Sequence, residues 1–479
     1  MRAILIAVVC ALLAATGVLL AAGANAEPAQ QDLRTQDVEF QSNGLTLHGT
    51  VYLPSNAGND GLRRPGIVLV HGSGPGPRAK YVPEAEAFAR AGIVTLVYDK
   101  RTDGYSVIER DYAQLADDAL AGVQTLRARP DVDPAKVGLW GLSEGGWVVP
   151  MAAAKSPEVA FIVTIGGSGQ PPLRQQTWSL DNMLRRHGVS GSLLDAVAPG
   201  GEFLSGLGLY PEADHDSATV LRQVHQPVLA LWGEHDTQVP PAESAQIFQQ
   251  ALAGNPHTTI RFVPGAGHNG HRTSDGFDRV GGLVVDGHPL GAMVPGYADV
   301  ITAWIDQVVA GNPPLSSLVG PVPHQEALSR APSGGAWYET APVGNAAVAL
   351  LLLGFLSYPL TTRLRRADHV VSQTRSVRRW ARWLTIFGLG AVIGAIAYLV
   401  WILGFAGPTE SAFLGGQPLT WLVLHILSLL VILTALATAF TWWRARTVVT
   451  GVLRVRLTLL LVAAAVFLPW ALYWRLFLP

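Results

Sequence analysis

A serine between two glycines is the first candidate for chemistry in this chain. The stretch "VGLWGLSEGGW" (residues 137–147) places Ser143 in the pattern G-x-S-x-G, with Gly141 and Gly145 as the flanking glycines. A serine hydroxyl becomes a nucleophile when a histidine takes its proton and a carboxylate orients that histidine. Because the chain contains 51 glycines, the pattern alone is weak evidence, and its meaning depends on the surrounding elements.

A carboxylate and a histidine follow the serine in the order that such a site requires. Asp236 lies in "LALWGEHDTQVP" and His268 in "IRFVPGAGHNG", each in a loop after a β-type run. Ser, then Asp, then His is the chain order of nucleophiles held on a strand-to-helix turn. Glu234 and His235 are rivals that lie closer to the strand. His271, three residues after His268, is a rival base.

Two backbone N–H groups should receive the oxyanion of an acyl-transfer reaction. One is the N–H of Glu144, directly after the serine. The other lies in "HGSGPG" (residues 71–76), where Ser73 is the first choice and Gly74 the competitor. We expect His71 to shape this loop by hydrogen bonding and not to act as the base.

The elements around these residues alternate between strands and helices. "DVEFQSNGLTLHGTVYLP" predicts two strands around the turn at Asn43 and Gly44, and six further apolar runs between residues 65 and 268 predict strands. The stretches 83–92 and 111–128 have helical spacing. Residues 27–310 therefore predict an α/β domain with a mostly parallel sheet and helices on both faces. Residues 170–225 form a short cap insertion after the sixth strand. The sequence places Ser143 where the fifth strand meets a helix.

The N-terminus has the layout of a secretory signal peptide. Arg2 precedes a long apolar core, and Ala24-Asn25-Ala26 supplies a cleavage pattern, so residues 1–26 are the expected signal. An uncleaved anchor helix is the alternative. The only cysteine, Cys10, lies in this segment, which excludes a disulfide or a thiolate nucleophile in a cleaved chain. A net charge of −1 gives no indication of nucleic-acid binding.

The C-terminal part has a different composition. Residues 311–342 are rich in proline and glycine and predict a linker, and residues 343–479 predict a transmembrane region. Four apolar runs, near 344–361, 384–406, 418–441 and 457–474, are each long enough to cross a bilayer. Arginines crowd the first and third connections, which therefore face the cytoplasm, and the α/β domain lies on the periplasmic or extracellular side. His425 is the one candidate polar group in the span cores. A transport role and a packed neutral histidine are both open for it, as is a membrane-protein partner for the spans.

Several motifs in a fixed order resemble the α/β-hydrolase superfamily. They are "HGSGPG", "YDKRTDGYS", "RPDVDPAKVGLWGLSEGGWVVP", "GEHDTQVP" and "GAGHNG". Within that superfamily the chain is similar to the dienelactone-hydrolase-like and prolyl-oligopeptidase-like bacterial hydrolases. Family members often show D-x-R-G-x-G-x-S after the fourth strand, and here Thr102 replaces the first glycine, so we expect that loop to differ in shape. The four-span tail lies outside the resemblance.

The resemblance implies a two-step acyl transfer by Ser143, His268 and Asp236, with Ser73 and Glu144 as the oxyanion hole. No cofactor or metal is required. A small ester with an apolar acyl part is the expected substrate, bound beneath the cap by Trp178, Phe203 and Tyr210. The linker leaves room for the domain to tip toward lipid. A peptidase, of the proline-specific or aminopeptidase type, and a non-catalytic binding or sensing module are the alternatives.

Overall fold

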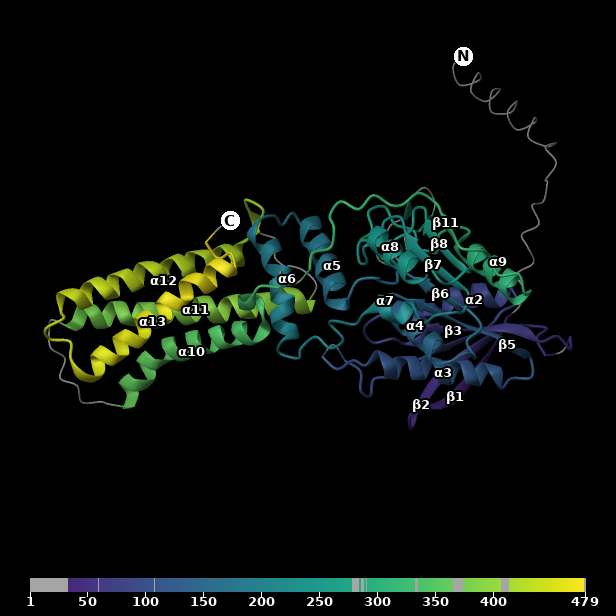
Figure 1. Cartoon of the computed structure of the whole chain (residues 1–479), viewed down its shortest axis with the longest axis horizontal. Coiled ribbons are helices and arrows are strands. Elements are labelled where there is room, and N and C mark those ends of the chain that lie inside the picture. Colours follow the sequence, from purple (N-terminus) through teal and green to yellow (C-terminus); the bar gives the residue numbers. More distant parts are fainter. Residues whose placement is uncertain are drawn as a thin grey trace, which may run out of the picture.

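The computed structural model describes residues 33–58, 60–106, 108–277, 284–285, 288–289, 291–331, 335–364, 374–405 and 413–477. The signal peptide predicted over residues 1–26 lies outside the described residues. An α/β domain and a bundle of four long helices lie end to end (Figure 1). Two helices of the cap, α5 (Pro172–Arg186) and α6 (Ser192–Ser205), stand between them (Figure 1).

A nine-stranded sheet forms the centre of the α/β domain, in the order β1-β2-β4-β3-β5-β6-β7-β8-β11. Its strands are β1 (Leu33–Ser42), β2 (Leu45–Pro54), β3 (Arg64–Val70), β4 (Val94–Tyr98), β5 (Val132–Leu142), β6 (Ile162–Ile165), β7 (Val228–Gly233), β8 (Thr258–Val263) and β11 (Ser317–Val319). Strands β1 and β2 form an antiparallel hairpin, β2 pairs antiparallel with β4, and the remaining neighbours pair in parallel. The predicted hairpin and the six further predicted strands are confirmed.

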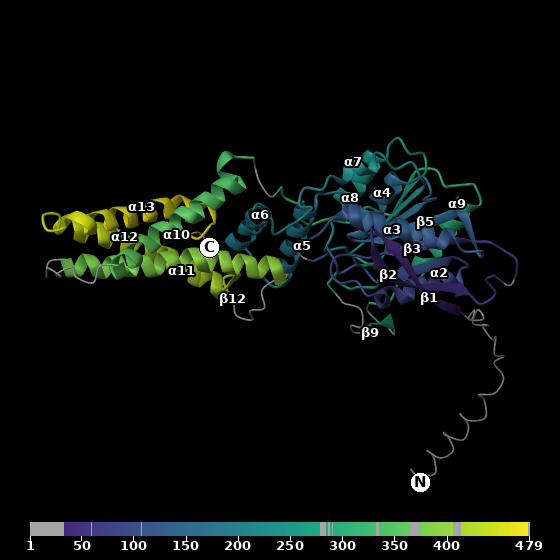
Figure 2. The ribbon, with the colours of Figure 1, turned by 90° about the horizontal axis from the view of Figure 1, so that it is seen from below.

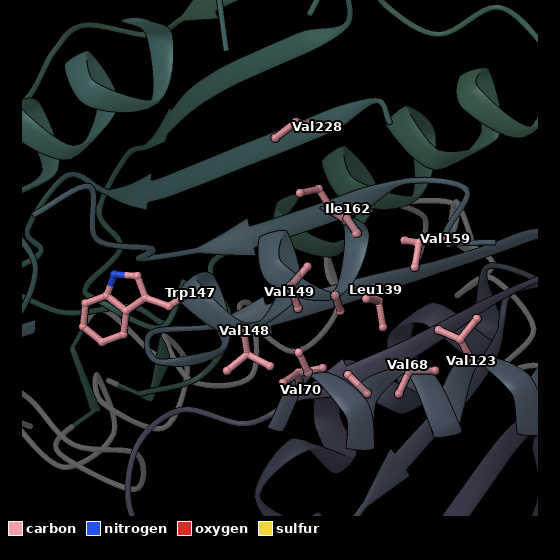
Figure 3. Close-up of a cluster of buried hydrophobic side chains, with 14 of the residues drawn as sticks. Val68, Val70, Val123, Leu139, Trp147, Val148, Val149, Val159, Ile162 and Val228 are labelled. Carbon is pink, nitrogen blue, oxygen red and sulfur yellow. The ribbon is translucent and has the colours of Figure 1, made fainter. Parts of the chain in front are cut away.

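Helices cover both faces of this sheet. One face packs against α3 (Tyr112–Arg127), α4 (Gly145–Lys155), α7 (Ser217–Leu221) and α8 (Pro241–Ala251), and the other against α2 (Val82–Arg90) and α9 (Tyr297–Val309). Figure 3 shows part of the first interface, where Val148 and Val149 of α4 and Val123 of α3 meet Val68 and Leu139 of the strands. Each fully buried side chain of this kind contributes about 1.5–3 kcal/mol relative to exposure. The α/β architecture predicted from the sequence is confirmed.

The segment predicted as a linker lies on the α/β domain. Within it β11 pairs in parallel with β8, and a short 3₁₀ helix, η2 (Trp337–Glu339), precedes the bundle. Trp178 Nε1 donates a hydrogen bond to the carbonyl of Ala327 at 2.8 Å, and Arg174 Nε donates to Ser329 Oγ at 2.8 Å. Strand β11 satisfies the edge of β8, which would otherwise present unpaired backbone groups. A three-residue strand in a proline-rich segment is too short to leave a periodic signal.

The bundle consists of α10 (Ala341–Leu364), α11 (Arg375–Phe405), α12 (Leu419–Arg444) and α13 (Gly451–Tyr473). Each is long and apolar enough to cross a membrane. Leu353, Leu433 and Leu436 are among the many large apolar side chains that the bundle exposes, as a lipid-facing surface requires. The remaining strands form two small hairpins, β9 (Val284–Val285) with β10 (His288–Pro289) and β12 (Phe413–Leu414) with β13 (Gln417–Pro418).

The cap is packed onto one end of this bundle, as both views show (Figures 1 and 2). Leu193 and Val197 of α6 belong to the same buried apolar cluster as Leu399 of α11 and Trp421 of α12. Trp421 Nε1 donates a hydrogen bond to Ser192 Oγ at 3.0 Å. The hydrophobic core of the bundle therefore continues into the cap.

The contact between the cap and the bundle also surrounds the side chain of His425. Its Nε2 lies 3.5 Å from Ser192 Oγ at the N-terminus of α6, and its ring meets that of Trp421 with the ring centroids 5.7 Å apart. Burial beneath the cap explains why a histidine is tolerated in an otherwise apolar span. This environment favours the packed histidine over the transport role.

Candidate active site

Ser143 occupies a sharp turn between β5 and α4. Its φ is +55°, in the left-handed region that non-glycine residues rarely adopt, and its N–H donates to the carbonyl of Ile165 at 2.9 Å. A Cβ on Gly141 would lie 2.3 Å from the Gly145 carbonyl oxygen, and one on Gly145 would lie 2.7 Å from the Val70 carbonyl oxygen. Both flanking glycines are therefore required by the closeness of the backbone. A strained backbone at one half-buried serine between two required glycines is typical of a nucleophile elbow.

His268 and Asp236 form a buried pair beside this turn. His268 Nδ1 lies 2.9 Å from Asp236 Oδ2, while Asp236 Oδ1 accepts hydrogen bonds from the N–H groups of Gln238 (2.9 Å) and Val239 (2.8 Å). His268 Nε2 has no hydrogen-bond partner among the described residues. His268 and Ser143 line the same cavity. The arrangement leaves one ring nitrogen of His268 able to accept a proton.

His271 lines the same cavity, but both of its ring nitrogens face other oxygen acceptors. Its Nε2 lies 2.8 Å from Glu84 Oε1 and its Nδ1 lies 2.5 Å from the carbonyl oxygen of Gly291. Burial would lower the pKa of His271, but the hydrogen bond and charge of Glu84, together with that carbonyl, raise it above its usual value. A histidine that directs both nitrogens at oxygen acceptors is a poor general base. The geometry favours His268 over His271.

The remaining rivals also have other roles. Glu234 accepts a hydrogen bond from the N–H of Gly265 at 2.9 Å, and His235 lies 3.8 Å from Glu234 at the surface. His71 Nε2 lies 2.5 Å from the carbonyl oxygen of Tyr98, and burial lowers the pKa of His71 to about 3. The neutral His71 ring thus holds the loop after β3 against the end of β4.

The loop after β3 carries the expected oxyanion donors. The N–H of Gly72 donates to Tyr81 Oη at 3.0 Å and that of Gly74 donates to Tyr105 Oη at 2.9 Å. No backbone or side-chain acceptor among the described residues takes the N–H of Ser73, which lies between them. Ser73 and Glu144 both line a cavity with Ser143. Of the two sequence candidates, this geometry favours Ser73 over Gly74.

A buried polar network beneath the elbow was not predicted from the sequence. The Lys100 ammonium donates to Glu144 Oε1, to Tyr105 Oη at 2.8 Å and to the carbonyl of Gly72 at 2.8 Å. Tyr105 Oη donates to Glu144 Oε1 at 2.9 Å, and Arg110 Nε lies 3.1 Å from Glu144 Oε2. Burial lowers the pKa of Lys100 to about 8, although the Glu144 carboxylate opposes this shift. The network joins both oxyanion loops to the "YDKRTDGYS" segment.

Two cavities meet at Ser143. The first, about 310 Å³, is lined by the His268 loop and includes Tyr81 and Arg272. The second, about 340 Å³, extends under the cap, and we refer to it as the cap cavity. Its lining residues are Ser73, Arg110, Ser143, Glu144, Trp147, Gln175, Gln176, Ser179, Met183, Tyr210, Thr237, Gln238, Gly276 and Phe277. The lining is more polar than the apolar acyl pocket that we expected.

Of the three expected pocket residues, only Tyr210 lines a cavity that contains Ser143. Trp178 lines a separate cavity of about 400 Å³ that includes Asp236 and residues 324–326. Phe203 packs instead against the Trp474 ring at the end of the bundle, with the ring centroids 6.0 Å apart. Phe203 is therefore not in the pocket where the sequence predicts it, because α6 turns its apolar side toward the spans and away from the sheet. Among the described residues no cluster of three or more His, Cys, Asp or Glu side chains could hold a metal ion.

Comparison with known proteins shows which families this chain is similar to. The family model described as "BAAT / Acyl-CoA thioester hydrolase C terminal" matches residues 121–270, which span the elbow, the cap and the Asp236 and His268 loops. The chain is 32% identical over 142 residues to Polyketide transferase claH of Penicillium crustosum, covering 27% of this chain and 44% of that protein. It therefore spans less than half the length of that relative.

Two further relatives are matched over longer stretches. An uncharacterized protein of Mycobacterium tuberculosis is 29% identical over 251 residues, which are 52% of this chain and 76% of that protein. Esterase EstD of Thermotoga maritima is 25% identical over 253 residues, which are 46% of this chain and 58% of that protein. The sheet order and the elbow show an α/β-hydrolase fold, to which these matches are similar, and four long apolar helices follow this domain.

Proposed function

We propose that this protein is a membrane-anchored serine hydrolase that cleaves carboxylic esters through an acyl-enzyme. The observation that carries the proposal is the buried His268–Asp236 pair. His268 Nε2 has no hydrogen-bond partner among the described residues, and His268 lines the cavity that Ser143 also lines. A non-catalytic binding module has no physical need for a strained serine beside an oriented histidine. The geometry therefore favours catalysis over binding alone.

In the proposed reaction Ser143 Oγ attacks the ester carbonyl while His268 Nε2 takes the hydroxyl proton. The oxyanion of the tetrahedral intermediate accepts hydrogen bonds from the N–H groups of Ser73 and Glu144. The imidazolium, stabilised by Asp236, then gives its proton to the leaving alcohol as the C–O bond breaks. Water attacks the acyl-enzyme by the same steps, which releases the acid and restores Ser143.

This mechanism assigns the two cavities to the two halves of the substrate. The leaving group must lie near His268, because that histidine protonates it, and so it occupies the cavity that contains Asn269 and Arg272. The acyl part lies on the side of the oxyanion donors and occupies the cap cavity. Its mixed lining suits an acyl group of limited length that carries some polar character.

A thioester is the second candidate substrate, because the matching family model is named for acyl-CoA thioester hydrolases. A panel tests the choice with the full chain in detergent. Nitrophenyl esters of rising chain length, an acyl-CoA and a proline-containing aminoacyl anilide are compared by kcat/KM, with Ser143→Ala as the control. We expect the esters to react fastest. Faster turnover of the acyl-CoA would assign a thioesterase, and faster turnover of the anilide a peptidase.

We also propose that the hydrolase domain faces the periplasm or the cell exterior. The arginine-rich connections between α10 and α11 and between α12 and α13 support this orientation, since such loops stay in the cytoplasm. The test introduces single cysteines at Leu315, in the hydrolase domain, and at Arg446, in a connection, in a Cys10→Ser chain. An impermeant thiol reagent on spheroplasts should label Leu315→Cys and spare Arg446→Cys. The reverse pattern would overturn the orientation.

A further inference from the structure

The C-terminal end of α6, in the cap, lies against the first turn of α10. A Cβ built on Gly206 would be only 1.9 Å from the Ala341 Cβ, and one built on Gly344 would be 3.6 Å from Phe203 Cδ2. Ala341 is also the first residue of the apolar stretch that is long enough to span a membrane. Residues 203–209 therefore lie at the level where this span would leave the bilayer.

Helix α6 reaches the same level on a second span. A Cβ on Gly200 would lie 3.2 Å from Leu403 Cδ1 and 3.7 Å from a methyl of Leu399, both near the end of α11. These leucines belong to the apolar stretch Arg375–Gly404. Two independent helix contacts thus place the cap at one boundary of the membrane.

Large apolar side chains are exposed around this boundary. Leu207 and Leu209 of the cap are 47% and 40% exposed, and Trp337 and Tyr338, just before α10, are 75% and 51% exposed. The Tyr338 ring contacts that of Tyr473 at the end of α13, with the centroids 6.3 Å apart. We call Leu207, Leu209, Trp337 and Tyr338 the apolar collar. Aromatic residues favour the membrane–water interface, where one end of the side chain is apolar and the other is hydrated.

The collar adjoins the cap cavity along the chain. Tyr210 directly follows Leu209 and lines the cap cavity together with Ser143. Met183, on α5, lines the same cavity. One short segment therefore connects the membrane boundary with the acyl side of the site.

We propose that the apolar collar rests in the headgroup region of the bilayer and that the substrate is an amphipathic ester residing in that interface. The ester enters the cap cavity from the membrane surface beside Tyr210. This inference rests on the proposed ester hydrolysis and adds to it the class and source of the substrate. A cap fixed on the spans holds the entrance at one depth, whereas a free linker would let the depth vary.

The position of the collar is tested without any activity. The full chain with Cys10→Ser is reconstituted in phosphatidylcholine–phosphatidylglycerol vesicles, and a nitroxide is attached to Leu209→Cys or, as control, to Leu315→Cys. Leu315 is 74% exposed and lies in the hydrolase domain. We expect the label at residue 209 to be relaxed more by oxygen than by a water-soluble nickel chelate, and the label at residue 315 to show the reverse. Equal behaviour at both positions would overturn the proposal.

The source of the substrate is tested with the double variant Leu207→Ser/Leu209→Ser. It should hydrolyse dissolved nitrophenyl acetate within about twofold of wild type, as expected of surface substitutions. It should hydrolyse nitrophenyl decanoate held in the same vesicles about tenfold more slowly, because the segment loses apolar area that anchors it in the interface.

The matched control is Leu62→Ser/Leu315→Ser, which changes two exposed leucines of the hydrolase domain and should leave both rates unchanged. An equal loss on both substrates, or no loss on either, would overturn membrane delivery. Failure of the wild type on both esters would instead refute ester hydrolysis, and the nitroxide measurement would still report the position of the collar.

Discussion

The turn at Ser143 and the junction between cap and bundle are built on different principles. At the turn, five consecutive residues fix the geometry, because Gly141 and Gly145 permit a backbone approach that no side chain would allow. At the junction, apolar side chains from α6, α11 and α12 meet across more than 200 residues of sequence, and each could be replaced by another of similar size. The comparison teaches that the turn that presents the nucleophile is encoded locally, whereas the approach to the site depends on long-range packing.

The largest expected effect lies at the turn and its partners. Ser143→Ala, His268→Ala and Asp236→Asn should each lower kcat/KM by about 10³-fold or more, and their combination should cost little beyond the most severe single change. His271→Ala should retain more activity than His268→Ala, since His271 directs both nitrogens elsewhere. Steady-state rates of the full-chain variants measure these changes in kcat/KM. Wild-type turnover by Ser143→Ala would show that Ser143 is not the nucleophile.

The next largest effect concerns the buried network below the turn. Lys100→Met removes the ammonium partner of the Glu144 carboxylate, and breaking a buried pair costs up to about 3–5 kcal/mol, a loss that the remaining contact with Arg110 reduces. Chemical unfolding of the full chain in detergent should show that loss, together with a lower kcat. Lys136→Met is the control, because the Lys136–Asp133 pair is partly exposed to solvent and should contribute about 1 kcal/mol at most. Equal losses in the two variants would show that the network is not buried as described.

A smaller effect is expected at the junction. Gly206→Ala places a methyl group where Ala341 lies, and such overpacking typically costs about 1–3 kcal/mol. Gly254→Ala is the control, because no atom of the described residues lies within 4 Å of a Cβ at Gly254. Thermal unfolding should separate the two variants, and the Gly206 variant should lose more activity on vesicle-borne ester than on dissolved ester. Identical behaviour of the two variants would contradict the packing of the cap on α10.

The smallest expected effect is a pH dependence of stability from the His271–Glu84 pair. The pKa of His271 is raised in the folded protein, so its stabilising contribution is fully present below the usual histidine pKa, about 6.5, and is lost as the pH rises through the higher folded value. Glu84→Gln should therefore lower the midpoint of thermal unfolding more at pH 6 than at pH 9. A difference that grows toward alkaline pH would contradict the assigned charge state.

Much of the hydrolase domain could be predicted from the sequence for physical reasons. Buried parallel strands leave continuous apolar runs, and a turn as tight as that at Ser143 requires small residues at fixed positions. The choice of Asp236 over Glu234 followed from the distance of each from its strand, and in the structure Asp236 is the residue paired with His268. Features of this kind depend on a few neighbouring residues.

Other features depend on partners that no short pattern reveals. Glu84, whose carboxylate lies against His271 Nε2, is 187 positions earlier in the chain. Lys100 and Tyr105 belong to the "YDKRTDGYS" motif, but their contact with Glu144 depends on how three loops meet. The sequence predicts Phe203 in the pocket because it lies in the cap insertion, and no short pattern shows that this insertion also packs on the spans. Its contact with Trp474 follows from the docking of the cap on the spans.

The central claim is that Ser143 is a nucleophile activated by His268, and fluorophosphonate labelling of the full chain tests it most directly. The probe is mixed with the detergent-solubilised protein at neutral pH, and the labelled peptide is identified by mass spectrometry. We predict a single adduct on Ser143 that is absent from Ser143→Ala and strongly slowed in His268→Ala, while His271→Ala labels at close to the wild-type rate. An adduct on another residue, or no labelling of the wild-type chain, would contradict the account.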